Sequence, residues 1–218
     1  MDPPSVPQPA VPVSLANTAF KTVLLSKDPT IKHTSLLIFV AFYFLLRVGE
    51  YTKPQTVMKD GKRVPATQTK QLIFYDVVFF CMGQMIPRRS PLKTLLTADI
   101  AVLKLTTQKY GKMGQTITQH ATGNAVCPVL SLAPIVHHTL SNGGTNDTLL
   151  CSYVARDKWH TVTAEGVVKQ VRSTAKVMKL LTTGINPLLI GAHSLRAGDA
   201  MALKLHGYAD TTIMKMER

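Results

Sequence analysis

The sequence predicts an α+β fold, a mainly α-helical domain with a small inserted antiparallel sheet or hairpin. Two observations lead to this expectation. Segments with helical periodicity and capping residues lie at both ends of the chain, and a middle region, residues 71–122, is rich in Val, Ile, Thr and Phe. The chain has 218 residues, of which 45% are hydrophobic, and this suffices for one core of that kind.

The first 14 residues predict an extended Pro-rich tail, because they hold five of the thirteen prolines. Residues 15–218 are expected to form one domain, which opens with a short helix at 15–26. The most apolar run, residues 35–46, is shorter than the roughly 20 residues that a membrane span needs. We therefore expect a buried helix, capped by Thr34 or Ser35 and running to about Tyr51.

The middle region predicts three strands, at residues 71–80, 99–108 and 115–122. The last two flank "KYGKMG", whose glycines suit the turn of a β-hairpin.

Three helices are expected in the second half of the chain. Residues 127–142 begin beside a proline and end at two glycines, and residues 163–181 carry Thr163 as a possible cap. A third helix begins near Ser194 and stops at Gly207. Its apolar side chains are expected to face the core, and they are Leu195, Met201, Leu203 and Leu205. Asp210 then begins a last helix, which reaches about two turns by Arg218 and is expected to fray.

The charge of the chain points to a polyanionic partner. The formal net charge is +13 and the isoelectric point is about 9.8, which suit either a nucleic acid or an anionic membrane surface. The three cysteines form no C-x-x-C pair, which argues against a disulfide framework and a zinc knuckle. We therefore expect an intracellular protein without a metal site.

Two pairs of charged residues lie at the ends of predicted helices. Arg47 and Glu50 are three residues apart at the end of the apolar run, so Glu50 can orient the guanidinium of Arg47. His193 and Arg196 lie at the start of another helix, where the helix dipole and backbone N–H groups favour a phosphate. The simpler interpretation of the first pair is an ordinary surface ion pair.

The tip of the predicted hairpin carries Lys109 and Lys112. These are ordinary turn residues, or a means of bringing an ammonium group to a phosphate. Phosphoryl transfer on DNA without a metal requires guanidinium groups to hold the phosphate, an imidazole for proton transfer and a donor for the leaving oxygen. The chain contains these groups in the order Arg, Lys and His-x-x-Arg.

Three segments resemble the catalytic domain of the tyrosine recombinases, the phage-integrase family, and most of all its divergent, transposon-associated branch in eukaryotes. They are "AFYFLLRVGEYTKP", "LKLTTQKYGKMGQ" and "IGAHSLRAGDAMALKLHGYADTTIMK". The resemblance implies cleavage and rejoining of double-stranded DNA, in the nucleus and without a cofactor. It assigns phosphate binding to Arg47 and Arg196, acid–base catalysis to His193, and protonation of the leaving group to Lys109, with Lys112 as the alternative.

The sequence departs from the family pattern near residue 218. The family has a His or Trp and then a nucleophilic Tyr in the helix after the H-x-x-R box, and here the six tyrosines all precede that place. We therefore expect residues 15–218 to be a catalytic domain that is incomplete at its C-terminus and inactive as it stands. The alternatives are a non-catalytic DNA-binding remnant of a transposable element and an unrelated basic helical module. Assembly of several copies on DNA is left open. Asp199 either approaches Arg196 or faces solvent.

Overall fold

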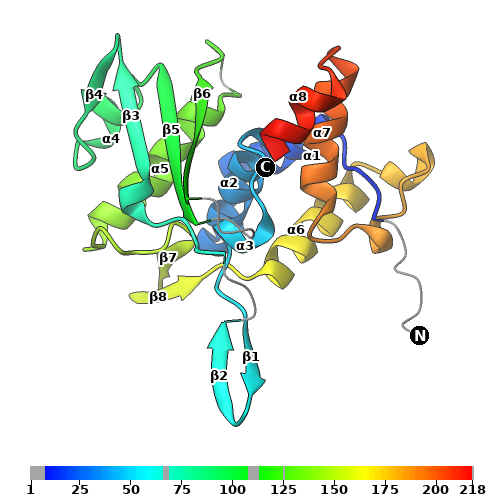
Figure 1. Ribbon diagram of the computed structural model, residues 1–218, viewed down its shortest axis with the longest axis horizontal. Coiled ribbons are helices and arrows are strands. Elements are labelled where there is room, and N and C mark those ends of the chain that lie inside the picture. Colours follow the sequence, from blue (N-terminus) through cyan, green and yellow to red (C-terminus); the bar gives the residue numbers. More distant parts are fainter. Residues whose placement is uncertain (1–7, 66–68, 108–112, 125, 218) are drawn as a thin grey trace.

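Helices occupy both ends of the chain and the strands lie mainly in its middle, as the sequence predicts (Figure 1). This computed structural model describes residues 8–65, 69–107, 113–124 and 126–217. The α-helices are α1 (Val13–Leu25), α2 (Pro29–Tyr43), α3 (Val48–Tyr51), α4 (Leu92–Leu95), α5 (Pro128–Ser141), α6 (Ala164–Val177), α7 (Ser194–Leu205) and α8 (Asp210–Glu217). The strands are β1 (Thr56–Lys59), β2 (Lys62–Pro65), β3 (Val77–Cys81), β4 (Gln84–Ile86), β5 (Ile100–Thr107), β6 (Met113–His120), β7 (Ser152–Ala155) and β8 (Lys158–Thr161). Three short 3₁₀ helices are η1 (Phe74–Asp76), η2 (Leu180–Thr183) and η3 (Pro187–Leu189).

Helix α2 is the centre of the core, with buried residues throughout 33–42. It packs against α1, α5, α6 and α7. The helix begins earlier than predicted, because Asp28 accepts a hydrogen bond from the backbone N–H of Thr30 at 2.7 Å and Pro29 occupies the first helical position. The caps expected at Thr34 or Ser35 are wrong, since both residues lie inside the helix. Among the described residues, no helix combines the length and apolar character that crossing a bilayer requires.

The apolar run is interrupted before Tyr51, so the prediction of one continuous helix is wrong. Leu45 adopts a left-handed conformation with φ 48°, and the N–H of Leu46 donates to the carbonyl of Ala41 at 2.9 Å. This is the Schellman arrangement that ends a helix, here with Leu where glycine is usual. Left-handed backbone at a non-glycine residue costs on the order of 1–3 kcal/mol, and burial of Leu45 offsets that cost. The turn redirects the chain into α3.

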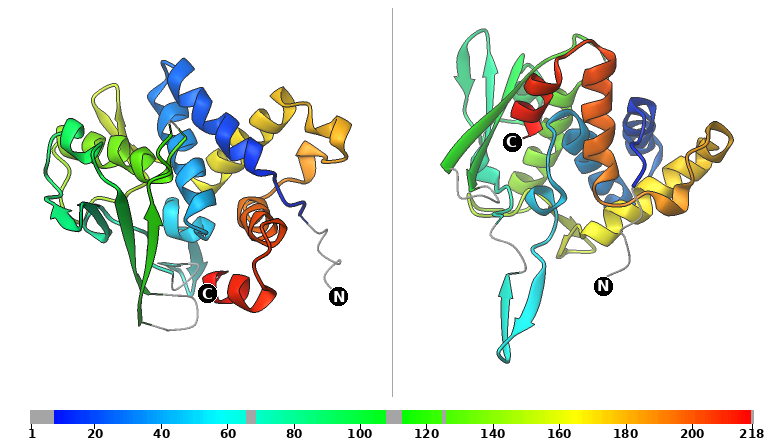
Figure 2. Two further views of the ribbon diagram at one scale, coloured as in Figure 1. Left: turned by 90° about the horizontal axis from the view of Figure 1, so that it is seen from above. Right: turned by 45° about the vertical axis from the view of Figure 1, so that its right-hand side comes forward.

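The principal sheet has the strand order β4-β3-β5-β6, and all its pairs are antiparallel. The predicted hairpin is confirmed as β5–β6, with Leu103 opposite Ile117. Ala101, Leu103 and Leu105 of β5 are buried, and the alternate residue Lys104 is exposed. Figure 2 shows this sheet at one side of the helical part of the molecule.

Strand β4, which forms a hairpin with β3, was not predicted, and neither were two hairpins outside the principal sheet. In β1–β2, Lys59 pairs with Lys62 around Asp60 and Gly61, whose φ angles are 51° and 73°. Positive φ at both turn residues matches a type I′ turn, for which Asp-Gly is a preferred pair, so the signal was present in the sequence. The second hairpin, β7–β8, turns at Arg156 and Asp157.

A cluster of aromatic and imidazole rings holds β7–β8 against the helices. His33 of α2 is buried, its Nε2 lies 3.1 Å from the carbonyl oxygen of Leu150, and its ring contacts Tyr153 of β7 and His138 of α5. Nε2 of His138 accepts a hydrogen bond from the backbone N–H of Val154 at 2.8 Å. Burial lowers the pKa of His33 from 6.5 to about 4, so His33 is neutral at pH 7.

Residues 8–12 pack along the start of α7. Val11 is buried, and its N–H donates to the carbonyl of Ser194 at 3.2 Å. Gly198 permits this approach, since a Cβ there would overlap the carbonyl oxygen of Val11. The expectation that Met201 and Leu205 face the core is wrong, because both side chains are largely exposed. Leu195 is buried and Leu203 is half-buried.

The last helix, α8, continues to Glu217 and packs against α7. Ile213 is buried, and Lys204 of α7 forms an ion pair with Asp210 at 3.2 Å. These contacts connect the short helix to the fold.

Candidate functional site

Arg47 and Glu50 form one end of the candidate site. Arg47 is the N-cap residue of α3, and Glu50 lies in the first turn of that helix. Oε2 of Glu50 accepts a hydrogen bond from the backbone N–H of Arg47 at 2.8 Å, and Oε1 lies 3.7 Å from Nη1 of Arg47. The side chain of Glu50 is 1% exposed and that of Arg47 is 19% exposed. Glu50 therefore fixes both the backbone and the guanidinium of Arg47, which is more than an ordinary surface pair does.

His193 and Arg196 form the other end of the site. His193 is the exposed N-cap residue of α7, and Arg196 lies half-buried in the first turn. The backbone N–H of His193 donates to Oε1 of Gln8 at 3.1 Å. The cap predicted at Ser194 is wrong: its hydroxyl oxygen accepts the N–H of Gly191 at 3.0 Å instead.

Tertiary packing brings the two ends together. Helix α2 leads into α3 and packs against α7, and α3 lies beside the start of α7 in Figures 1 and 2. Burial raises the pKa of Tyr43, near the end of α2, and the nearby carboxylate of Asp199 in α7 raises it further. Asp199 is itself buried, so it does not face solvent. Arg47 and Arg196 are thus carried by neighbouring helices, although they are far apart in the sequence.

The two candidate lysines, Lys109 and Lys112, lie outside the described residues. The described parts of β5 and β6 lie on the other side of α3 from α7, and α8 extends toward them in both views of Figure 2. The sheet and the α7–α8 pair therefore flank α3.

Five of the six tyrosines are described, and none of them is placed as a nucleophile for a phosphate at Arg196. Arg196 lies nine residues before the end of α7, so about 13.5 Å of helix, at 1.5 Å per residue, separates it from the turn that carries Tyr208. The hydroxyl of Tyr43 donates to Asn17 at 2.8 Å, and Tyr51 is fully buried with its pKa raised above the ordinary value. Tyr153 donates to Thr30. The ring of the last described tyrosine, Tyr75, lies under the guanidinium of Arg88.

In the part of the chain that the structure describes, no group of three or more His, Cys, Asp or Glu side chains is arranged to hold a metal ion. The three cysteines are free thiols, and burial raises the pKa of Cys151 to about 12.

Comparison with known proteins identifies the fold. No family model matches the chain, and no curated protein matches its sequence. Among solved structures, the chain is similar to the crystal structure of the XerH site-specific recombinase bound to its difH substrate in a pre-cleavage complex, with a TM-score of 0.53 and 12% identity. The match covers 97% of this chain and 47% of the recombinase, so the chain spans about half the length of that protein. The chain therefore has a tyrosine-recombinase-like, integrase-like fold.

Proposed function

We propose that this chain belongs to a DNA strand-cleaving and rejoining protein of the tyrosine-recombinase type. The observation that carries the proposal is the adjacency of α3 and the start of α7, which support Arg47 and the pair His193 and Arg196. The fold shared with a site-specific recombinase supports the same interpretation. Double-stranded DNA is the proposed partner, and the net charge of +13 is consistent with a large phosphate surface.

Each residue has a distinct role in this proposal. Arg47, held by Glu50, and Arg196 bind the non-bridging oxygens of one phosphate and stabilise the charge that develops on them. A tyrosine hydroxyl attacks the phosphorus and passes its proton to His193, so that a 3′-phosphotyrosyl bond forms. The bond to the 5′-oxygen breaks, and Lys109, or Lys112 in its place, protonates that oxygen. Rejoining reverses these transfers, and no metal or nucleotide is consumed.

The proposed nucleophile is not one of the five tyrosines that the structure describes. Accordingly, we propose that residues 15–218 by themselves do not cleave DNA. From the resemblance of its motifs, we further propose that the protein belongs with the transposon-associated recombinases of eukaryotes and acts in the nucleus. Assembly of several copies on DNA belongs to the same proposal.

A second function, DNA binding without catalysis, is favoured by one observation. The hydroxyl of Tyr43 is hydrogen-bonded to Asn17, and Tyr208 lies beyond the far end of α7 from Arg196. Neither of these nearby tyrosines is therefore placed to attack a phosphate at Arg196. In that case the arginines would hold phosphate without any covalent step.

Two measurements test these proposals. Fluorescence anisotropy with a labelled duplex should show affinity that falls steeply between 50 and 200 mM salt. Arg47→Ala and Arg196→Ala should each weaken binding, whereas Arg156→Ala in the exposed β7–β8 turn is the matched control. Equal affinities of all three variants would refute phosphate binding at this site.

Catalysis is tested with a nicked suicide duplex and denaturing electrophoresis. The present chain should give no covalent adduct. The same chain extended by a C-terminal helix carrying a Trp or His and then a Tyr should give one, which Arg196→Ala should abolish. An adduct formed by the present chain through any of the five described tyrosines would overturn the proposal that none of them is the nucleophile. DNA binding without an adduct in every extended variant would favour the non-catalytic function.

A further inference from the structure

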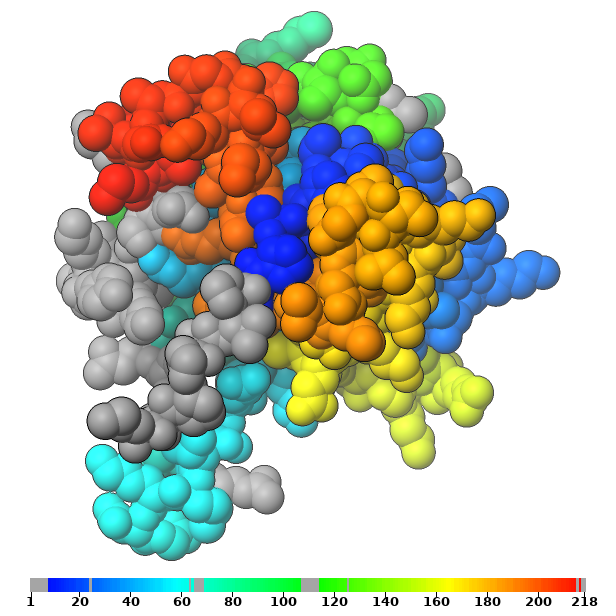
Figure 3. All heavy atoms as spheres, turned by 90° about the vertical axis from the view of Figure 1, so that its right-hand side faces the viewer, coloured from blue at the N-terminus to red at the C-terminus, as the bar shows by residue number. Residues whose placement is uncertain are grey.

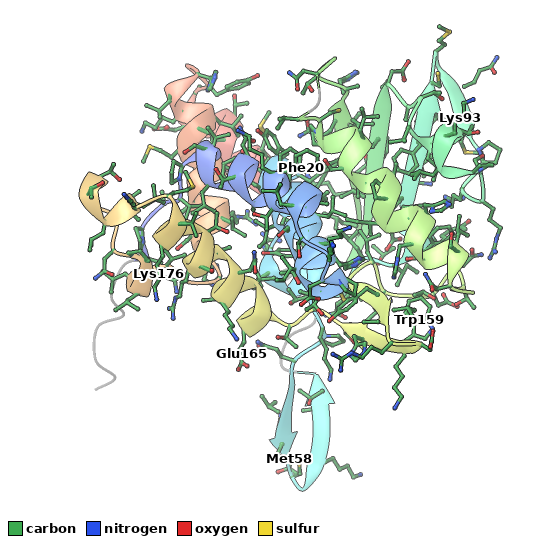
Figure 4. The ribbon with its side chains drawn as sticks, turned by 180° about the vertical axis from the view of Figure 1, so that it is seen from behind. Phe20, Met58, Lys93, Trp159, Glu165 and Lys176 are labelled. Atoms are coloured by element: carbon green, nitrogen blue, oxygen red, sulfur yellow. The ribbon has the colours of Figure 1, made fainter. Side chains whose placement is uncertain are left out.

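The β1–β2 hairpin, residues 56–65, projects from the body of the molecule (Figure 1). All four residues of β1 are exposed, and the strand packs chiefly against β2. Figure 4 shows Met58 on this arm, away from the helices. An isolated two-stranded hairpin is marginally stable in water, so an arm of this kind gains order from a partner.

The arm directly follows the candidate site. Tyr51 ends α3, and the next anchor is Lys53, whose backbone N–H donates to the carbonyl of Val162 at 2.7 Å. In Figure 3 the arm (cyan) and α8 (red) lie at the same side of the molecule, whereas the start of α2 (blue) lies at the opposite side. In Figure 1 α3 lies between α8 and the arm, so a duplex that extends along this side from α8 across α3 reaches the arm.

The charge at the turn is unfavourable in the free protein. Lys59 and Lys62 are directly paired across the strands, so their side chains leave the same face of the ribbon, and both are exposed. Like charges at directly opposite positions destabilise a hairpin, and an anion between or beside them removes that repulsion. From Lys53 to Pro65 the sequence has four basic residues against one acidic residue, Asp60.

We propose that the β1–β2 hairpin is a second DNA contact, in which Lys59 and Lys62 bind backbone phosphates of the duplex beside the phosphate held at Arg47. This inference rests on the proposed function. A four-residue strand spans about 13 Å, so the tip reaches about four base pairs further along the duplex than the site does. A two-stranded ribbon also matches the width of the major groove of DNA, which gives the arm a place to lie.

The exposed apolar residues Val57 and Met58 would suit a protein partner instead. The lysine pair at the turn favours DNA, because its charge repulsion is relieved by phosphate and not by an apolar surface.

The experiment compares two double variants that remove the same charge. Lys59→Gln/Lys62→Gln alters the arm, and Lys27→Gln/Lys32→Gln alters exposed residues at the far side. Affinity for a labelled 30-base-pair duplex is measured by anisotropy from 50 to 400 mM salt, and thermal melts establish that both variants are folded. Lys59→Arg/Lys62→Arg, which keeps both charges, should bind like the unaltered chain.

Two phosphate contacts contribute about 1.8 to the slope of log binding constant against log salt concentration, so this slope should be shallower by about 1.8 for the arm variant. At 0.1 M salt the arm variant should therefore bind the duplex about 60-fold more weakly than the unaltered chain. The far-side variant should keep the slope of the unaltered chain. Equal slopes for the two variants would overturn the inference and would leave Val57 and Met58 as a protein-binding surface. That result leaves the proposed function standing, because the proposed function is tested separately by the Arg47 and Arg196 variants and by the binding of the unaltered chain to the duplex.

Discussion

Acidification from pH 7 to pH 5 should destabilise this protein through His33. His33 is buried, and burial lowers its pKa from 6.5 to about 4, with the carbonyl of Leu150 opposing and His138 adding to the shift. In the unfolded chain the imidazole binds a proton near pH 6.5, and in the folded chain it does so only near pH 4. The stability associated with His33 is therefore fully present above pH 6.5 and is lost as the pH falls toward 4.

The size of the effect follows from those two values. The difference between the two pKa values corresponds to about 3 kcal/mol of free energy of unfolding, and about 2 kcal/mol of it is lost between pH 7 and pH 5. For a chain of 218 residues this lowers the melting temperature by roughly 4–8 °C. The pKa of His138 is also lowered by burial, so His138 acts in the same direction.

The assay is urea unfolding at pH 7 and pH 5 for the unaltered chain, for His33→Gln and for His206→Gln. His206 is an exposed residue at the end of α7 and serves as the matched control. The unaltered chain and His206→Gln should lose about 2 kcal/mol more on acidification than His33→Gln does. If all three lose the same stability, His33 does not fold as a neutral imidazole and the reasoning is refuted.

Three further predictions concern stability. Glu50→Ala should cost about 3–5 kcal/mol by urea unfolding, because it leaves the half-buried guanidinium of Arg47 without its carboxylate; a loss below 1 kcal/mol would contradict the role assigned to Glu50. Gly198→Ala should destabilise by about 2 kcal/mol, since displacing Val11 outweighs the better helix propensity of alanine, and a higher melting temperature would disprove this. Asp28→Ala should cost about 1 kcal/mol by removing the cap of α2, and an unchanged denaturation midpoint would count against that cap.

The local sequence was sufficient for several elements. Two segments rich in β-branched and apolar residues, on either side of glycines that suit a turn, predicted the β5–β6 hairpin. Thr163 caps α6 as expected, accepting the N–H of Gly166 at 3.0 Å. Pro128 begins α5 as expected, because the backbone N–H that proline lacks has no partner within the helix at that position. Asp60-Gly61 carries an equally local signal for the β1–β2 turn.

The sequence by itself determined the fold class, the positions of the long helices and of the β5–β6 hairpin, and the residue types of the candidate site, because periodicity and capping depend on neighbours within a few residues. Only the tertiary structure decided that α2 ends at Tyr43, since burial of Leu45 in the turn that follows outweighs its unfavourable φ. It also decided that Val11 fits over Gly198, and that α3 lies beside the start of α7. Those arrangements depend on packing between residues far apart in the chain, and pattern along the sequence does not encode such distances directly.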